Sequence, residues 1–312
     1  MRSTEEGSQV NSPSGRQYRI SHGDQQATIV EVGGGIRTYR VGRRDVLQPY
    51  PVESMCDGAH GAPLIPWPNR LGDGRYRFDE TDYQVPLNEP DKGNAIHGFL
   101  RWRPWQPVHQ SADHIVMTAT LYPLEGYPFL LDVQVDYRLD DTGLTVSTTA
   151  SNLGERPCPY GCGQHPYLSP GSGLIDDCTL KLAANIRIVT DPERELPTGS
   201  EPVEGTPFDF RTGRPIGDLA VDYAFTDLDR DPDGRCWVSL LAPDGRTSEL
   251  WVDRTYPIIE LYTADTLGVE RRRRGLGTEP MTCPPNAFQS GHGVIRLDPG
   301  QSTTATWGAR LT

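Results

Sequence analysis

Strict alternation of apolar and polar residues is the feature that most restricts the fold of this chain. In residues 131–139 (LDVQVDYRL) every odd-numbered residue is aliphatic or aromatic and every even-numbered residue is polar. A β-strand places successive side chains on opposite faces, so this segment has one buried face and one wet face. The turn sequence DDTG at 140–143 separates it from a second alternating segment at 144–150. The two segments together predict a hairpin.

Similar alternation continues through most of the chain, whereas a helical period does not. No window of about a dozen residues combines a helical apolar period with capping residues. The 33 glycines and 28 prolines suit many short strands joined by turns. These observations predict an all-β fold, specifically a large antiparallel β-sandwich. Besides the first hairpin, we expect hairpins at 27–32 with 36–41 and at 236–241 with 248–252, and strands at 114–121, 258–263 and 303–309.

The 312 residues show no linker composition and no fixed-period repeat, so we expect one domain over residues 18–312. Residues 1–17 are polar and contain no apolar run typical of a secretory signal, so we expect a flexible N-terminal tail. No segment approaches the roughly 20 apolar residues that cross a bilayer, and the six cysteines are too sparse for a disulfide framework. We therefore expect a cytoplasmic monomer or homodimer that does not contact a membrane.

The formal net charge of −12 argues against one class of partner. Proteins that bind nucleic acid need a positive surface to displace counterions from phosphates, and this chain is acidic overall. We interpret its one basic run, Arg271–Arg274, as a solvated loop because no aromatic residue lies within it. The chain also lacks nucleotide-binding glycine loops, zinc- and serine-hydrolase motifs and metal-ligand spacing. We therefore expect neither a cofactor nor a metal.

Several residues capable of binding lie in stiff segments between the expected strands. Asn69 and Arg70 end a stretch rich in proline and tryptophan, where they either bind a ligand or face water. His97 precedes a glycine that permits close backbone packing or a positive φ, although a lone histidine in a loop is more often structural. Trp102 and Trp105 offer flat apolar faces of the kind that pack on sugar C–H groups.

His165, Asp222 and Glu279 are the candidates for chemistry that involves charge. His165 lies in GCGQHPY, where the following proline keeps it out of a helix, and histidine transfers protons well near neutral pH. Glu279 is the one carboxylate in a proline-stiffened apolar loop, where burial would raise its pKa as a general base requires. Asp222 is either a surface charge at a strand end or a buried acceptor for hydroxyl groups.

Together these segments resemble the aldose 1-epimerase (galactose mutarotase) family over nearly the whole chain after the tail. PWPNR at 66–70 resembles the family's substrate-binding loop, NAIHG at 94–98 its N-x-x-H-G motif, and GQHPY at 163–167 the segment around its catalytic histidine. DYAF at 222–225 is similar to its D-x-x-F motif. EPMT at 279–282, followed by PNAF at 285–288, resembles the segment with its catalytic glutamate.

The resemblance implies a β-supersandwich of the galactose mutarotase type with a shallow cleft for a small-molecule sugar. It implies that Glu279 removes the proton of the anomeric hydroxyl and that His165 protonates the ring oxygen. The α and β anomers of a free galactose- or glucose-like aldose would then interconvert without a cofactor. The residues that it implies for sugar binding are Arg70, Asn69, His97 and Asp222.

Three alternatives stay open at this point. The Arg271–Arg274 run would suit a phosphate, and hence a hexose-6-phosphate 1-epimerase of the same superfamily. A non-catalytic carbohydrate-binding β-sandwich needs aromatic and hydrogen-bonding groups, but no glutamate that faces a histidine. A glycosidase or polysaccharide lyase on a related sandwich is the third; a glycosidase needs two carboxylates at a defined separation, and beside Glu279 only Asp222 is available, as a poor second.

Overall fold

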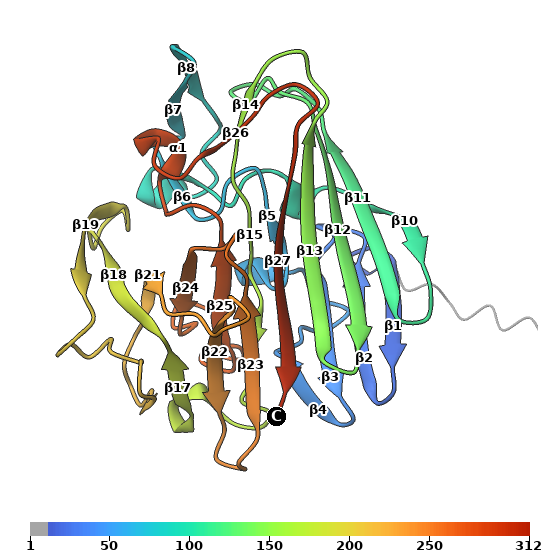
Figure 1. The fold of residues 1–312 in the computed structure, drawn as a ribbon, viewed down its shortest axis with the longest axis vertical. Helices are drawn as coiled ribbons and strands as arrows, with labels where there is room; N and C mark the ends of the chain where they lie inside the picture. The colour runs from blue at the N-terminus through green and yellow to red at the C-terminus, as the bar shows by residue number, and fades with distance from the viewer. Residues whose placement is uncertain (1–11) are drawn as a thin grey trace, which may run out of the picture.

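The computed structural model describes residues 12–312 and consists almost entirely of antiparallel strands. Two large sheets form the body of the molecule (Figure 1), and residues from both sheets pack into one shared core. The predicted all-β sandwich is therefore confirmed. None of the helices within residues 12–312 is long and apolar enough to cross a membrane.

The larger sheet has twelve strands in the described part of the chain. In spatial order it contains β1 (Gln17–His22), β2 (Gln25–Val30), β3 (Ile36–Val41), β4 (Arg44–Leu47), β16 (Tyr167–Leu168), β25 (Leu276–Met281), β24 (Ile258–Tyr262), β21 (Asp222–Leu228), β18 (Ala184–Thr190) and β19 (Pro197–Pro202), with β15 (Gly163–Gln164) paired to β25 and to β5 (Pro63–Leu64). The strands β16, β25 and β24 thus lie at the middle of this sheet.

The second sheet has nine strands in the same range of residues. Its order is β10 (Gln106–Gln110), β11 (His114–Leu121), β12 (Leu131–Asp140), β13 (Gly143–Asn152), β27 (Ser302–Leu311), β23 (Thr247–Val252), β22 (Cys236–Leu241), β17 (Thr179–Leu182) and β20 (Arg214–Pro215). Figure 1 shows β13 and β27 crossing the centre of the view.

Short elements connect and extend the two sheets. The small strand pairs are β6 (Arg70–Gly72) with β9 (Asn94–Ile96), β7 (Arg75–Phe78) with β8 (Thr81–Gln84), and β14 (Cys158–Tyr160) with β26 (Ile295–Leu297). The helical turns are η1 (Asp57–Ala59), η2 (Pro90–Lys92), η3 (Leu100–Trp102), η4 (Ile175–Asp177) and α1 (Ala287–Ser290).

The alternation seen in the sequence becomes the burial pattern of the strands. Along β12 the apolar residues from Leu131 to Leu139 are buried and the polar residues between them are not. The strand pairs with β13 in the register Leu139↔Leu144, as the predicted hairpin requires. The other two predicted hairpins are β2–β3 and β22–β23, and the three predicted single strands are β11, β24 and β27.

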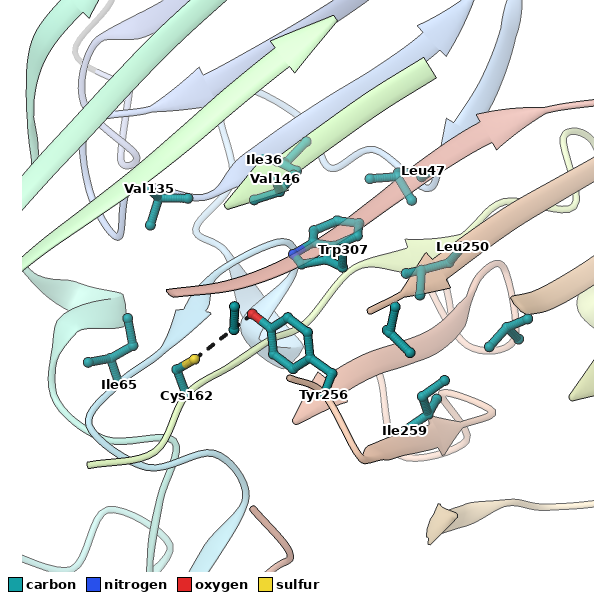
Figure 2. Packing of buried hydrophobic residues seen from close by; sticks show 14 of the residues in the cluster. Ile36, Leu47, Ile65, Val135, Val146, Cys162, Leu250, Tyr256, Ile259 and Trp307 are labelled. Atoms are coloured by element: carbon teal, nitrogen blue, oxygen red, sulfur yellow. Dashed lines mark hydrogen bonds between the residues drawn. The ribbon is translucent and has the colours of Figure 1, made fainter. Parts of the chain in front are cut away.

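Trp307 of β27 links the core to the strand that precedes His165. Figure 2 shows its ring among apolar side chains from both sheets, including Leu47 of β4 and Val146 of β13. Its indole N–H donates to Gln164 Oε1 at 3.1 Å, and the Gln164 amide donates to Gly61 O and Tyr137 Oη. Gln164 is completely buried, so these bonds fix the backbone just before His165. Truncating Trp307 to alanine would cost about 3–5 kcal/mol of stability.

Hydrogen bonds tie residues just before position 18 to the sandwich. Residues 1–11 of the expected tail lie outside the described residues. Within the described part, Ser12 Oγ donates to Val52 O at 2.8 Å and Ser14 O accepts from Val32 N at 3.0 Å. Residues 12–17 are therefore held by backbone and side-chain hydrogen bonds that composition does not reveal, and the boundary at residue 18 stays a prediction that truncation can test.

Candidate active site

His165 and Glu279 lie side by side on the larger sheet. His165 stands between β15 and β16, both of which pair with β25, and Glu279 lies inside β25. The distance from His165 Nε2 to Glu279 Oε1 is 3.1 Å, and the two side chains are 6% and 3% exposed. We expected Glu279 in a stiff loop, and this was wrong. It lies in a strand whose backbone pairs with neighbours on both sides, which holds the carboxyl group more firmly than a loop would.

Burial favours the uncharged form of both groups. It lowers the pKa of His165 to about 3, with the nearby Arg101 guanidinium acting in the same direction. It raises the pKa of Glu279 well above its ordinary value, with the Asp222 carboxylate contributing to the rise. At pH values between the lowered pKa of His165 and the raised pKa of Glu279, the pair binds one proton rather than two or none. A direct transfer over 3.1 Å then decides which of the two residues carries that proton.

His97 presents a neutral imidazole next to this pair. The Asn69 backbone N–H donates to His97 Nδ1 at 3.1 Å, so Nδ1 carries no proton and Nε2 carries the hydrogen of the neutral ring. Both residues have left-handed φ angles, 55° and 63°. The next residue, Gly98, also has a positive φ, and a Cβ there would lie 2.0 Å from Ile65 O. The sequence-based interpretation of this glycine is confirmed.

Arg70 is held in place by three carboxylates. Its guanidinium donates to Glu89 at 3.0 Å, forms a short ion pair with Glu195, and lies 4.0 Å from Asp222 Oδ2. Lys92 pairs with Glu89 and Glu195 from the other side. The planar donor fork of arginine suits such an arrangement, because several acceptors can be met in one plane. The charges nearly cancel, which leaves Arg70 rigid and available to a neutral polar ligand.

Asp222 and Glu260 form a second pair of acidic groups in the site. Asp222 begins β21 and contacts the pocket, while Glu260 lies behind it on β24 and is 3% exposed. Burial is the main reason that the pKa of Glu260 rises well above its ordinary value, and the Asp222 charge adds to the rise. Burial raises the pKa of Asp222 only to about 6, so Asp222 is the one of the two that is charged at neutral pH, beside a protonated Glu260.

These side chains line one pocket of about 240 Å³, a size suited to a single small molecule. All six residues that the family resemblance assigns to catalysis or sugar binding contribute to it, namely Asn69, Arg70, His97, His165, Asp222 and Glu279. A larger hollow of about 600 Å³ beside β1–β3 has no histidine or glutamate in its lining. The pocket around His165 is therefore the place where acid–base chemistry is available.

Three groups in the pocket also have the composition of a metal site. Ligand atoms of His97, His165 and Glu279 all lie within 4.8 Å of one another. Two imidazoles and a carboxylate suit zinc. Three residues distant in sequence supply them, so spacing could not predict this grouping.

Comparison with known proteins identifies the family. The family model described as aldose 1-epimerase matches residues 16–309. The chain belongs to the aldose 1-epimerase family. It is 36% identical to the uncharacterized protein YihR of Escherichia coli K12 over 296 residues, which cover 92% of this chain and 91% of YihR. It is 29% identical to rat galactose mutarotase over 266 residues, which cover 77% and 75% of the two chains.

Solved structures of other members share the fold. An aldose epimerase homologue from Caenorhabditis elegans superimposes with a TM-score of 0.84 at 19% identity, covering 95% of this chain and 98% of the homologue. A putative aldose 1-epimerase from E. coli K12 gives 0.81 at 22% identity, covering 95% and 99%. The chain is thus an isomerase of the aldose 1-epimerase type on a galactose mutarotase-like sandwich.

Several residues in or next to the pocket were missed in the sequence, and among them Glu260 is not part of the lining. Glu260 could have been noticed in the sequence, because it is the one charged residue in the apolar strand IIELY at 258–262. No sequence pattern indicates Glu89, Lys92 or Glu195, since they lie in loops or turns that only the tertiary fold brings close to Arg70. No sequence pattern indicates Arg101 either. Arg101 lines the pocket, and its guanidinium makes no hydrogen bond or ion pair with residues 12–312.

Two predictions about aromatic and basic residues were wrong. Trp102 and Trp105 do not line the pocket, because Trp105 is buried in the core and Trp102 faces a different surface hollow. Arg271–Arg274 is not a uniformly solvated loop. Arg273 is 8% exposed and pairs with Asp176 and Asp265, and Arg271 pairs with Asp57. Asp57 and Asp176, which are far away in sequence, help to neutralise these two arginines, and no local pattern indicates those two pairs.

Proposed function

We propose that the protein interconverts the α and β anomers of a free aldose, with Glu279 as base and His165 as acid. The observation that carries this proposal is the 3.1 Å contact between the two side chains in a buried pocket of about 240 Å³. Ring opening needs a proton removed at one oxygen and delivered at the neighbouring one. An acid and a base this close together fit the spacing of those two oxygens, and each contributes about 10²- to 10⁴-fold.

The reaction balances with these two side chains. Glu279 takes the proton of the anomeric hydroxyl while His165, protonated, gives its proton to the ring oxygen. The O–H electrons form the C1=O1 double bond, and the electrons of the broken C1–O5 bond stay on O5. After rotation about C1–C2 the transfers run backwards and the ring closes on the other face. The pair ends with the same single proton that it had at the start.

The remaining pocket groups are assigned to binding. His97 donates from Nε2, since its Nδ1 is occupied by Asn69. Arg70 donates to sugar hydroxyls and Asp222 accepts from them, because both line the pocket and are held by neighbours. Free galactose and glucose are the first substrates to examine, because relatives such as the rat protein are named galactose mutarotases.

Polarimetry of freshly dissolved anomers tests this proposal. We expect faster relaxation of α-galactose or α-glucose, insensitive to EDTA, and no acceleration by Glu279→Gln. A loss of activity in EDTA that one divalent metal restores would contradict the metal-free mechanism. Sugar binding without any change of relaxation rate on galactose, glucose, arabinose or xylose would favour the carbohydrate-binding alternative.

A sugar with an anionic substituent, such as a hexose 6-phosphate, is a second candidate substrate. Its sequence-based support weakens, because Arg271 and Arg273 are paired with acids. Arg101 supports it instead. Its guanidinium lines the pocket without a carboxylate within 4.0 Å among residues 12–312, and its Nε is buried without a partner. Arginine matches phosphate and carboxylate oxygens with paired donors.

Comparing glucose with glucose 6-phosphate separates the two candidates. If the substrate is anionic, kcat/KM is higher for the phosphate, and Arg101→Met lowers it selectively for that sugar. If the substrate is neutral, Arg101→Met changes both sugars alike and the phosphate is the poorer substrate.

A further inference from the structure

Three aromatic rings form a stack that ends on His165. The His60 and Tyr167 rings lie 3.8 Å apart at an angle of 3°, and the Tyr167 and His165 rings lie 4.9 Å apart at 15°. All three side chains are buried. The His165 imidazole is therefore stacked on Tyr167, and Tyr167 is stacked in turn on His60. Glu279 contacts Nε2 at the edge of the His165 ring.

Tyr167 and His60 each have an anchor outside the stack. The Tyr167 hydroxyl donates to Gly58 O at 2.7 Å, in the turn just before His60. The Arg271 guanidinium donates to His60 Nδ1 at 2.9 Å and forms a short ion pair with Asp57. Because arginine only donates, Nδ1 accepts and the His60 ring is the Nε2–H tautomer. The clamp of Asp57 and Arg271 thus fixes how His60 lies.

His60 needs this clamp because its ring is buried. A buried imidazole nitrogen without a partner is costly, so a ring that lost Arg271 would turn toward water and open the stack. Its Nε2 already lacks a partner among the described residues, which makes Arg271 the one side chain there that holds a ring nitrogen of His60. Tyr50 meets His60 edge-on at 6.1 Å and supports its plane without bonding it.

We propose that Arg271 and His60 are positioning residues for His165, acting through the stacked ring of Tyr167. They hold the imidazole plane so that Nε2 faces Glu279, although neither residue lines the pocket. This proposal rests on the proposed acid role of His165. Alignment matters because an error of about 1 Å in a reacting group costs on the order of 100-fold in rate.

Four variants and one control test the proposal by kcat and KM on the best anomer. His60→Ala removes the stack and Arg271→Met removes the clamp, and both should lower kcat by about ten-fold or more with little change in KM. His60→Phe keeps a flat ring that needs no partner and should stay within a few-fold of wild type. The double variant Arg271→Met/His60→Phe should recover most of what Arg271→Met loses. Arg272→Met is the matched control, since Arg272 is exposed and forms no ion pair with residues 12–312.

The rescue separates positioning from general stability. If His60→Ala or Arg271→Met keeps wild-type kcat, or if the double variant is no better than Arg271→Met, the proposal is wrong. Should His60→Ala fail to fold, the comparison of Arg271→Met with the double variant still decides.

Nitrogen-15 NMR of the His165 side chain gives a readout that does not depend on turnover. The His165 nitrogen shifts should move in Arg271→Met and return in the double variant. Unchanged shifts in Arg271→Met would overturn the positioning role. A wild-type protein inactive on every sugar, but with these shift changes, would instead refute the proposed function alone.

Discussion

Glu260 lies directly opposite Glu279 across the β24–β25 ladder, and both side chains are only 3% exposed. Two buried carboxyl groups in opposed positions cannot both be charged without a large cost. Burial and the neighbouring carboxylates raise the pKa of Glu260 well above its usual range, so Glu260 keeps its proton and is a neutral group beside Asp222.

This relationship predicts how Glu260 variants behave. Glu260→Gln keeps a neutral polar group beside Asp222, so kcat and KM should stay within a few-fold of wild type. Glu260→Ala removes that group and leaves Asp222 less well held, so KM should rise several-fold with a smaller effect on kcat. Steady-state kinetics of both variants measure this. Inactivation by Glu260→Gln would show that Glu260 works as a charged group.

Glu279 and His165 should behave as one unit. Glu279→Gln keeps shape but accepts no proton, and His165→Asn keeps polarity but delivers none. Each should lower kcat by about 10²-fold or more, and the double variant should be little worse than either, because groups that act together are not additive. Polarimetry with each purified variant measures this, and thermal unfolding controls for the fold. Near wild-type kcat in Glu279→Gln would require a different base.

The pH profile should be a bell with a wide plateau. Activity needs one proton on the pair. Burial lowers the pKa of His165 to about 3, so a second proton binds to the pair only at acidic pH. That second proton inactivates the enzyme, because no base is then left. Burial raises the pKa of Glu279, so the shared proton leaves only well above the ordinary range of a carboxyl group. Both limbs belong to the coupled pair. The dependence of kcat/KM on pH checks this, and a narrow optimum with an acidic limb near 6.5, the ordinary value for histidine, would contradict it.

Arg70 should matter for binding and for stability. Arg70→Met removes the donor for sugar hydroxyls and leaves Glu89, Glu195 and Asp222 with only Lys92 to offset them. We expect KM to rise by about ten-fold and unfolding stability to fall by about 1–2 kcal/mol, which is less than for a fully buried pair because the carboxylates of Glu89, Glu195 and Asp222 are 20%, 26% and 36% exposed. Arg70→Lys, which keeps the charge but not the fork, should be intermediate in both. Denaturant unfolding and kinetics on the same samples measure the two effects.

Two truncations test where the folded part begins. A chain that starts at Tyr18 loses the hydrogen bonds of Ser12, Ser14 and Arg16 to Val52, Val32 and Glu31, so its melting temperature should fall by several degrees. A chain that starts at Ser12 lacks only the polar residues 1–11 and should match the full chain. Equal melting temperatures for both truncations would show that these bonds contribute nothing.

The sequence by itself determined the sandwich and the identity of the central pair. Alternation in 131–139 appears directly as the burial pattern of β12, because the period of two is a local property of extended backbone. The motifs around His165 and Glu279 were recognisable because each lies within a few consecutive residues.

Tertiary structure decided everything that depends on residues far apart along the chain. It placed Glu279 in a strand, brought Glu89 and Glu195 to Arg70, and joined Arg271 to His60 across 211 positions. It also left Arg101 as a cation in the pocket without an acidic partner among the described residues. Burial and charge pairing arise from which strands become neighbours, and local sequence carries no record of that choice, so the pKa values and the positioning stack follow only from the fold.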